Sequence, residues 1–224
     1  MVFVGCRSSA IGALLRTTVS HRAPALLVFA KDPVPGSVKS RLGPILSAAG
    51  AARVAAELVQ AALVTAVAAR AEGIVDSVTL CCTPTTSAFF GECAARFDVA
   101  LDVQRGNDLG ARMQNALNDA LAQGRSALLM GSDCPALNGH YLAAGANALA
   151  THDVVIGPAE DGGYVLIGLA RMLDCFSAIA WSSASVLAET RQRLAELGAS
   201  WAELPTLWDV DTPADLARWK ALPA

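Results

Sequence analysis

Histidine and aromatic side chains are scarce in this chain: it has three histidines, and aromatic residues make up 5% of the sequence. Positive charge shows no excess either, because 17 lysines and arginines are set against 20 aspartates and glutamates, which leaves a formal net charge of −3. Proteins that hold nucleic acids neutralise phosphates with a surplus of basic residues. We therefore expect no nucleic-acid partner.

Long hydrophobic runs are also missing from the sequence. Of the 224 residues 54% are hydrophobic, but much of this content is scattered alanine, and a bilayer span needs about 20 consecutive apolar residues. We therefore expect neither a membrane span nor a membrane partner. The six cysteines include no Cys-x-x-Cys pair, which argues against a zinc site of that spacing and favours a reduced, cytoplasmic location.

Four common α/β signatures are also absent. The sequence contains no G-x-G-x-x-G, no Gly-Lys of a P-loop, no G-x-S-x-G and no H-E-x-x-H. Their absence excludes the usual dinucleotide-dependent dehydrogenases, P-loop ATPases, serine hydrolases and zincins. The histidines, at positions 21, 140 and 152, stand alone, and we interpret them as solvated or capping residues rather than general bases.

What is present is an alternation of strand-length apolar runs with helical patterns. Strands are predicted at 25–30, 74–81, 99–104, 127–130, 153–157, 164–169 and 201–204, and helices at 47–70, 88–96, 109–122, 138–150, 182–197 and from 212 onward. This alternation predicts an α/β fold with a largely parallel sheet covered on both faces. We expect one domain at 24–224, and a poorly ordered N-terminal extension at 1–23.

The loop after the first predicted strand carries two cations within three residues, Lys39 and Arg41. Gly36, in the Pro-Gly turn of the same loop, permits close approach of the backbone to a ligand. Lysine offers a point charge and arginine a planar fork, and both suit phosphate. We interpret Gly36, Lys39 and Arg41 as nucleotide-binding residues, the alternative being a solvated basic loop.

A carboxylate, Asp133, follows the apolar strand predicted at 127–130, in the segment GSDCP. An acid at this place is costly to desolvate unless it meets a cation. A divalent ion such as Mg²⁺ is held by one or two carboxylates together with substrate phosphates; the alternative is an aspartate that caps its own loop. We interpret the adjacent Cys134 as a small buried residue rather than a nucleophile.

Two more acids, Asp209 and Asp211, lie in the segment LWDVDTP ahead of the last predicted helix. In an extended chain, two residues at this spacing point the same way. One of them could complete a two-carboxylate metal site with Asp133. Alternatively, Asp211 belongs only to the entry of the helix, which the pattern Thr212-Pro213-Ala214-Asp215 predicts.

Two further segments combine amide or acid groups with glycine where strands end. The first offers Asn107 and Asp108 for nucleotide binding, and the second offers four candidates for substrate binding, Glu160, Asp161, Gly162 and Gly163. Such groups suit a site that recognises a base, a ribose or sugar hydroxyls. The alternatives are a helix cap in the first segment and a hairpin turn in the second.

Five segments, in this order, resemble the rSAM/selenodomain-associated transferase 1 family: FAKDPVPGSVKSRLG, RGNDLGARM, GSDCPAL, GPAEDGGYVLIGL and LWDVDTPADL. That family, also described as arsenosugar-biosynthesis-type glycosyltransferases, belongs to the nucleotide-diphospho-sugar transferase superfamily. The resemblance implies a three-layer, Rossmann-like GT-A fold with a mostly parallel mixed sheet. It also implies that Asp133 and Asp211 bind Mg²⁺ or Mn²⁺ and that Lys39 and Arg41 bind the nucleotide phosphates.

The leading interpretation is a metal-dependent glycosyltransferase that uses a nucleotide-diphosphate sugar and a small-molecule acceptor. Lys39 and Asp133 are its predicted catalytic residues on the side of the leaving diphosphate, and Asp161 or its neighbour Glu160 positions and deprotonates the acceptor hydroxyl. One alternative is a nucleotidyltransferase that joins an NTP to a phosphorylated small molecule and releases pyrophosphate. The single acid in Ser132-Asp133-Cys134, where many sugar transferases have two, somewhat favours it. A non-catalytic nucleotide-binding protein is the other alternative.

Overall fold

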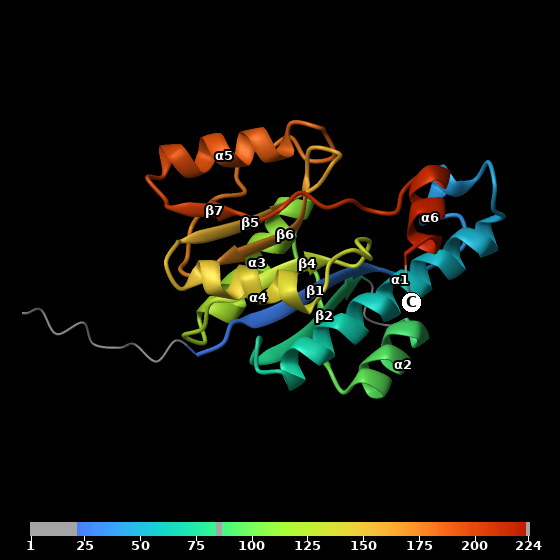
Figure 1. The fold of residues 1–224 in the computed structure, drawn as a ribbon, viewed down its shortest axis with the longest axis horizontal. Coiled ribbons are helices and arrows are strands. Elements are labelled where there is room, and N and C mark those ends of the chain that lie inside the picture. Colours follow the sequence, from blue (N-terminus) through green and yellow to red (C-terminus); the bar gives the residue numbers. More distant parts are fainter. Residues whose placement is uncertain (1–21, 84–86, 223–224) are drawn as a thin grey trace, which may run out of the picture.

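A computed structural model describes residues 22–83 and 87–222, so nearly all of the predicted extension at 1–23 lies outside the described residues. Within these ranges, seven strands form one sheet in the order β3-β2-β1-β4-β6-β5-β7 (Figure 1). The strands are β1 (Ala25–Lys31), β2 (Ser77–Thr83), β3 (Ala100–Val103), β4 (Ala127–Gly131), β5 (Val154–Pro158), β6 (Tyr164–Leu169) and β7 (Trp201–Glu203).

Most neighbouring strands run parallel, and β6 alone in this sheet runs antiparallel to its neighbours, β4 and β5. The connections are α1 (Ala48–Ala71), α2 (Ala88–Phe97), α3 (Leu109–Leu121), α4 (Gly139–Leu149), α5 (Val186–Glu196) and α6 (Pro213–Lys220), with a short 3₁₀ turn, η1 (Ser40–Leu42). The predicted α/β class with a mostly parallel mixed sheet is therefore confirmed.

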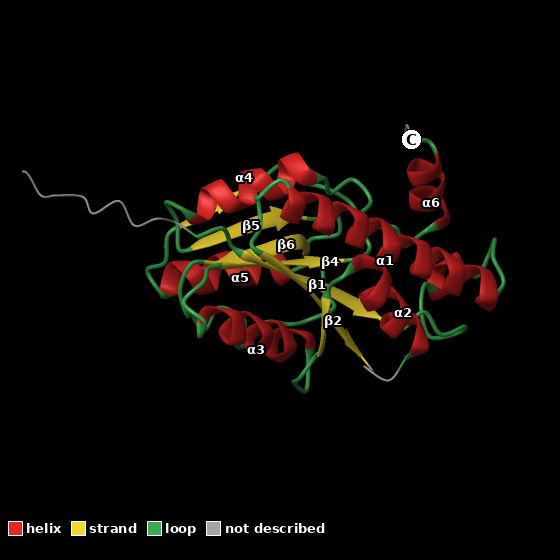
Figure 2. Cartoon of the chain, turned by 90° about the horizontal axis from the view of Figure 1, so that it is seen from below, coloured by secondary structure: helices red, strands yellow, loops and turns green. Residues whose placement is uncertain are grey.

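The core lies on both faces of the sheet, as the alternation along β1 shows. Leu26 and Val28 pack with α1, α2 and α4, whereas Leu27 and Phe29 pack on the opposite face with α3 and α5. Figure 2 shows α1 and α4 on one side of the strands and α3 on the other. Because helices cover both faces of such an apolar strand, polar groups can contact a ligand at the ends of the strand.

Helix α1 bears on the expectation that the chain has no membrane span. By length and composition alone, Ala48–Ala71 is long and apolar enough to do so. Its buried face, however, includes Val59 and Leu63, which pack against β1 and β2 in the core of the domain. The apolar character of α1 is thus used to cover the sheet.

Two element boundaries differ from the prediction for local reasons. The strand predicted from residue 74 begins at Ser77, because the Ile74 N–H donates to the Ala69 carbonyl (2.9 Å) and so still closes the end of α1. The helix predicted from residue 182 begins at Val186, because Ser182 has a positive φ of 66° and the Ser183 hydroxyl donates to the Ala180 carbonyl (2.7 Å).

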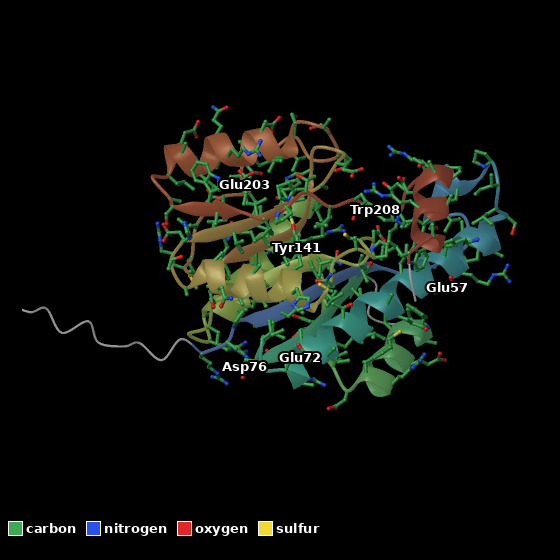
Figure 3. The ribbon with its side chains drawn as sticks, in the orientation of Figure 1. Glu57, Glu72, Asp76, Tyr141, Glu203 and Trp208 are labelled. Atoms are coloured by element: carbon green, nitrogen blue, oxygen red, sulfur yellow. The ribbon has the colours of Figure 1, made fainter. Side chains whose placement is uncertain are left out.

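A third group of buried side chains joins the loop after β1 to the C-terminal end of the chain. Leu42, in η1, packs with Leu58 of α1 and with Trp208, Val210 and Leu216 of the C-terminal segment. Figure 3 shows Trp208 on the chain that leads into α6. This cluster, which we call the Leu42 cluster, holds two segments together that are far apart in the sequence.

Truncation of Leu42 to alanine is expected to lower the free energy of unfolding by about 2–5 kcal/mol, because it leaves a cavity in the Leu42 cluster. Urea denaturation followed by circular dichroism measures the loss. The matched control is Ile45→Ala in the same loop, where the side chain is 55% exposed and the change is expected to be less than about 0.5 kcal/mol. Equal losses in the two variants would contradict the packing role of Leu42.

Candidate functional site

Three segments meet at the carboxyl ends of β1 and β4. These strands are parallel neighbours, so the loop after β1 and the turn after β4 emerge on the same edge of the sheet. The Ser132 N–H donates to the Phe29 carbonyl (3.1 Å), and the Val210 N–H donates to the Asp133 carbonyl (2.9 Å). The second of these hydrogen bonds ties the segment before α6 to the turn after β4.

Asp211 is oriented by the start of α6. The Thr212 side chain accepts from the Asp215 N–H, and the Asp215 carboxylate accepts from the N–H groups of Thr212 (2.7 Å) and Asp211 (3.2 Å). This capping box, predicted from the sequence, fixes the chain just after the Leu42 cluster. The Asp211 side chain can therefore turn toward the loop after β1.

Lys39 lies at the centre of the site. Its ammonium nitrogen is 2.8 Å from Asp133 Oδ2 and 3.1 Å from Asp211 Oδ1, so the structure brings three of the predicted residues together. The Lys39 side chain is 5% exposed, whereas the two carboxylates are 45% and 44% exposed. The Lys39 backbone is left-handed, with φ 49°, a conformation that costs a non-glycine residue energy and is typical of functional sites.

The charges in this cluster shift the pKa values of two groups. Burial alone lowers the pKa of Lys39, but the carboxylates of Asp133 and Asp211 outweigh it, so that the pKa rises above its usual value of 10.5. Asp209 lies close by, and burial, together with repulsion from Asp133 and Asp161, raises its pKa to about 7. Lys39 is therefore a permanent cation, whereas Asp209 titrates near neutral pH.

The donors at the site fit a hard divalent cation. Lys39 contacts one oxygen of each carboxylate, Asp133 Oδ2 and Asp211 Oδ1, and both carboxylates remain partly exposed. Two carboxylates that converge in this way, completed by substrate phosphates, are typical of Mg²⁺ sites. No cluster of three or more His, Cys, Asp or Glu side chains suited to a metal occurs in the described part of the chain, so the substrate would have to supply further ligands.

A cavity of about 520 Å³, which we call the lysine pocket, opens beside Lys39. Among its lining residues are three basic side chains, Lys31, Lys39 and Arg112, together with Gln104, Asp133 and Asp211. The Gln104 side-chain amide donates to the carbonyls of Ala30 (3.1 Å) and Cys81 (2.9 Å), which fixes this residue at the ends of β1 and β2. The basic lining makes this pocket suited to a phosphorylated ligand.

A second cavity, of about 550 Å³, adjoins the first, and we call it the tryptophan pocket. It shares Phe29, Leu109, Gly131 and Asp211 with the lysine pocket. Its other lining residues include Arg41, Asp161, Gly163, Tyr164, Trp181 and Asp209. Asp211 thus lies at the border between two neighbouring cavities. A side chain in this position can contact both partners of a transfer reaction.

Several of the predicted nucleotide-binding residues lie outside the lysine pocket, and some of them form a turn or cap a helix instead. Gly36 has φ 84° and forms the turn of the loop, but the loop lines the lysine pocket through the residues after it. Asp108 caps α3 by accepting from the Ala111 N–H (2.7 Å), and neither Asn107 nor Asp108 lines the two cavities. Arg41 lines the tryptophan pocket instead of the lysine pocket, 3.9 Å from Asp211 Oδ2.

Only some residues of the predicted substrate-binding segment line a cavity. Asp161 and Gly163 line the tryptophan pocket, and the Gly163 N–H donates to Asp161 Oδ1 (2.9 Å). Glu160 forms an ion pair with Arg218 (3.0 Å) outside both cavities. Gly162 has φ 90°, and a Cβ there would lie 2.2 Å from the Ala184 carbonyl oxygen, so this glycine allows the segment before α5 to pack against the turn.

Cys134, next to Asp133, is buried as the sequence predicted. Burial, with the nearby Asp209 carboxylate, raises the pKa of its thiol to about 11. The thiol is therefore protonated at neutral pH and is a poor nucleophile. The two cavities are also lined by Gln104, Arg112 and Trp181, which were not among the predicted site residues.

Comparison with known proteins identifies relatives of this chain. A family model described as uncharacterized protein conserved in bacteria (DUF2064) matches residues 55–183, more than half of the chain. A crystal structure from Desulfovibrio desulfuricans G20, provisionally named a nucleotide-diphospho-sugar transferase, is 32% identical, with a TM-score of 0.74 over 86% of this chain and 84% of that one. No curated protein matches the sequence.

More distant structures share the fold alone. 4-Diphosphocytidyl-2C-methyl-D-erythritol synthase from Anaerococcus prevotii DSM 20548 is 10% identical, with a TM-score of 0.59 over 89% of this chain and 97% of that one. A CMP:2-keto-3-deoxy-manno-octonic acid synthetase in complex with CTP is 16% identical, with a TM-score of 0.54 over 89% and 98% of the two chains. With the family match and the relative at 32% identity, the chain belongs to the DUF2064 family and has the Rossmann-like fold of the nucleotide-diphospho-sugar transferases.

Proposed function

We propose that this protein is a metal-dependent transferase that uses a nucleotide-diphosphate sugar as donor and a small molecule as acceptor. The observation that carries the proposal is the Lys39 ammonium, held between Asp133 and Asp211 where two cavities meet. The relative from Desulfovibrio desulfuricans, whose name is that of a nucleotide-diphospho-sugar transferase, supports the same class of reaction. The narrower resemblance to the rSAM/selenodomain-associated transferases is part of this proposal.

The lysine pocket binds the diphosphate of the donor in this proposal. Lys31, Lys39 and Arg112 present positive charge to it, and such charge stabilises the negative charge that grows on a leaving diphosphate. Asp133 and Asp211 would hold Mg²⁺ or Mn²⁺, which when bound supplies further positive charge at the same phosphates. Lys39 donates a hydrogen bond to the leaving group from a buried, fixed position.

The tryptophan pocket holds the acceptor, and Asp161 takes its proton. The hydroxyl oxygen of the acceptor forms a bond to the anomeric carbon of the donor sugar, while the bond from that carbon to the diphosphate oxygen breaks. The diphosphate leaves with the electron pair, and the hydroxyl proton moves to the Asp161 carboxylate. The Gly163 N–H holds Asp161 Oδ1 in place and leaves Oδ2 free for this proton.

Nucleotidyl transfer is the second candidate, and the segment after β4 favours it. Only Asp133 is acidic there, since Ser132 and Cys134 flank it. In this reaction the same basic residues would stabilise attack at the α-phosphate of an NTP. The two candidates release different products, nucleoside diphosphate in the first and pyrophosphate in the second.

The test is a product assay with the full chain and Mn²⁺, in which a panel of NDP-sugars is supplied with small hydroxyl compounds and a panel of NTPs is supplied with phosphorylated small molecules. We expect nucleoside diphosphate to appear from at least one NDP-sugar, and its release to stop when EDTA removes the metal. Release of pyrophosphate from NTPs alone would support the second candidate. If calorimetric titration shows no nucleotide or NDP-sugar binding at all, both candidates are wrong.

A further inference from the structure

We propose that the acceptor is an uncharged hydroxyl compound with a flat apolar side, such as a sugar ring, and not a phosphorylated molecule. The inference rests on the proposed function and deepens it by assigning a chemical class to the tryptophan pocket. It also separates the two candidate reactions, because the nucleotidyl transfer considered above needs a phosphorylated acceptor.

The two neighbouring cavities differ in charge. The lysine pocket has three basic side chains, at positions 31, 39 and 112, against the carboxylates of Asp133 and Asp211. The tryptophan pocket has one basic side chain, Arg41, against the carboxylates of Asp161, Asp209 and Asp211. A ligand with two phosphates is therefore attracted to the first cavity, and a second anion is repelled from the other.

Arg41 does not reverse this difference. Its side chain is 74% exposed, and its guanidinium is 3.9 Å from Asp211 Oδ2. An exposed arginine is largely screened by water, and here an acid already faces it. If Asp211 is assigned wholly to the lysine pocket, Asp161 still balances the charge of Arg41 in the tryptophan pocket, and Asp209 adds negative charge whenever it is ionised.

The carboxylates of the tryptophan pocket are suited to hydroxyl groups. An ionised carboxylate only accepts hydrogen bonds, and a hydroxyl is an uncharged donor. A phosphate oxygen or another carboxylate offers no proton to them at neutral pH. The polar side of the tryptophan pocket therefore selects ligands that carry several hydroxyls and no anionic group.

An aromatic wall completes the tryptophan pocket. Trp181, half-buried, lies against Gly110 of α3 so closely that a Cβ on that glycine would be 2.4 Å from the indole ring. Phe176 also lies near it, with ring centroids 6.1 Å apart. These two neighbours hold the indole in position, and Phe29, Met113 and Leu129 add apolar lining. A fixed aromatic ring beside acidic groups suits a molecule with one apolar side and several hydroxyls.

Binding of matched pairs tests this inference. The full chain, with Mn²⁺ and the nucleotide that binds best, is titrated with glucose and glucose 6-phosphate, glycerol and glycerol 3-phosphate, and myo-inositol and inositol 1-phosphate, followed by saturation-transfer NMR. We expect at least one uncharged member to bind at least about fivefold more tightly than its phosphorylated partner. Tighter binding of the phosphorylated members, or no binding of any uncharged member, would overturn the inference.

Substitutions in the tryptophan pocket provide the second arm. Trp181→Ala is expected to weaken binding of the uncharged probe about tenfold, and Trp181→Phe to restore most of it, with unchanged donor affinity in both. Ala184→Lys places a cation at an exposed position of the lining, and is expected to tighten glucose 6-phosphate at least about fivefold. The control Ala188→Lys, exposed on α5 outside the cavity, should leave it unchanged.

The outcomes distinguish this inference from the proposed function. Failure of every nucleotide and NDP-sugar to bind in calorimetry rejects the proposed function. Normal donor binding, together with a preference for phosphorylated probes, rejects only the assignment of the tryptophan pocket. An equal effect of Ala184→Lys and Ala188→Lys would also reject that assignment, because the added charge would then act from anywhere on the surface.

Discussion

Lys39→Met is expected to lower transferase turnover at least about 100-fold, the size of effect seen when one preorganised donor to a developing negative charge is removed. Methionine keeps an unbranched side chain but carries no charge, so Asp133 and Asp211 lose the cation that now lies 2.8 and 3.1 Å from them. The leaving diphosphate loses a hydrogen-bond donor at the same time. Steady-state kinetics with the best NDP-sugar measures the effect on kcat and KM.

Lys31→Met is the matched control for Lys39→Met. Lys31 also lines the lysine pocket, but it is exposed and donates to the Ser37 carbonyl (2.8 Å). We expect a loss of less than about tenfold there, because water screens an exposed charge. Circular dichroism of both variants checks that they fold. Turnover by folded Lys39→Met within twofold of the unmodified chain would show that Lys39 has no role in the reaction.

Asp133→Asn is expected to remove the dependence of nucleotide binding on the metal. An amide has nearly the same shape as the carboxylate but no charge, so the affinity for the nucleotide with Mn²⁺ should fall at least about tenfold, toward the value measured with EDTA. Calorimetric titration in the presence and absence of Mn²⁺ measures this. The expected loss is larger than for a surface carboxylate because Asp133 faces the lysine pocket.

Asp161→Asn is the informative control for Asp133→Asn. Asp161 lines only the tryptophan pocket, so this variant is expected to keep its affinity for the donor nucleotide and to lose about 100-fold or more in turnover as its base is removed. The two variants should therefore separate donor binding from proton transfer. Donor affinity that falls in Asp161→Asn but not in Asp133→Asn would reverse the assignment of the two cavities.

The layout of the fold could be predicted from the sequence because each strand was a short apolar run between helical patterns. Parallel neighbours then place their following loops on one edge, which is why Lys39 and Asp133 were expected in one crevice. The capping pattern at Thr212 likewise predicted the helix that orients Asp211. These inferences need only local pattern and the direction of neighbouring strands.

The other features of the site could not be predicted, because they depend on contacts between residues far apart in the sequence, and such contacts leave no local sequence pattern. Glu160 pairs with Arg218, 58 residues away in the sequence, and so turns from the cavity toward α6. Trp181 lies in an irregular segment, and its close approach to Gly110 of α3 and to Phe176 shows that its ring is fixed. Arg112 reaches the lysine pocket from the first turns of α3, where a basic residue is usually a solvated one.

The most direct test of the central claim is a crystal structure of the chain with Mn²⁺ and a nucleoside diphosphate, with diffraction recorded at the manganese absorption edge. We predict an anomalous peak in contact with carboxylate oxygens of Asp133 and Asp211, with the diphosphate in the lysine pocket and the Lys39 ammonium in hydrogen-bond contact with a phosphate oxygen. A diphosphate bound away from Lys39, or a manganese peak that touches neither carboxylate, would contradict the claim.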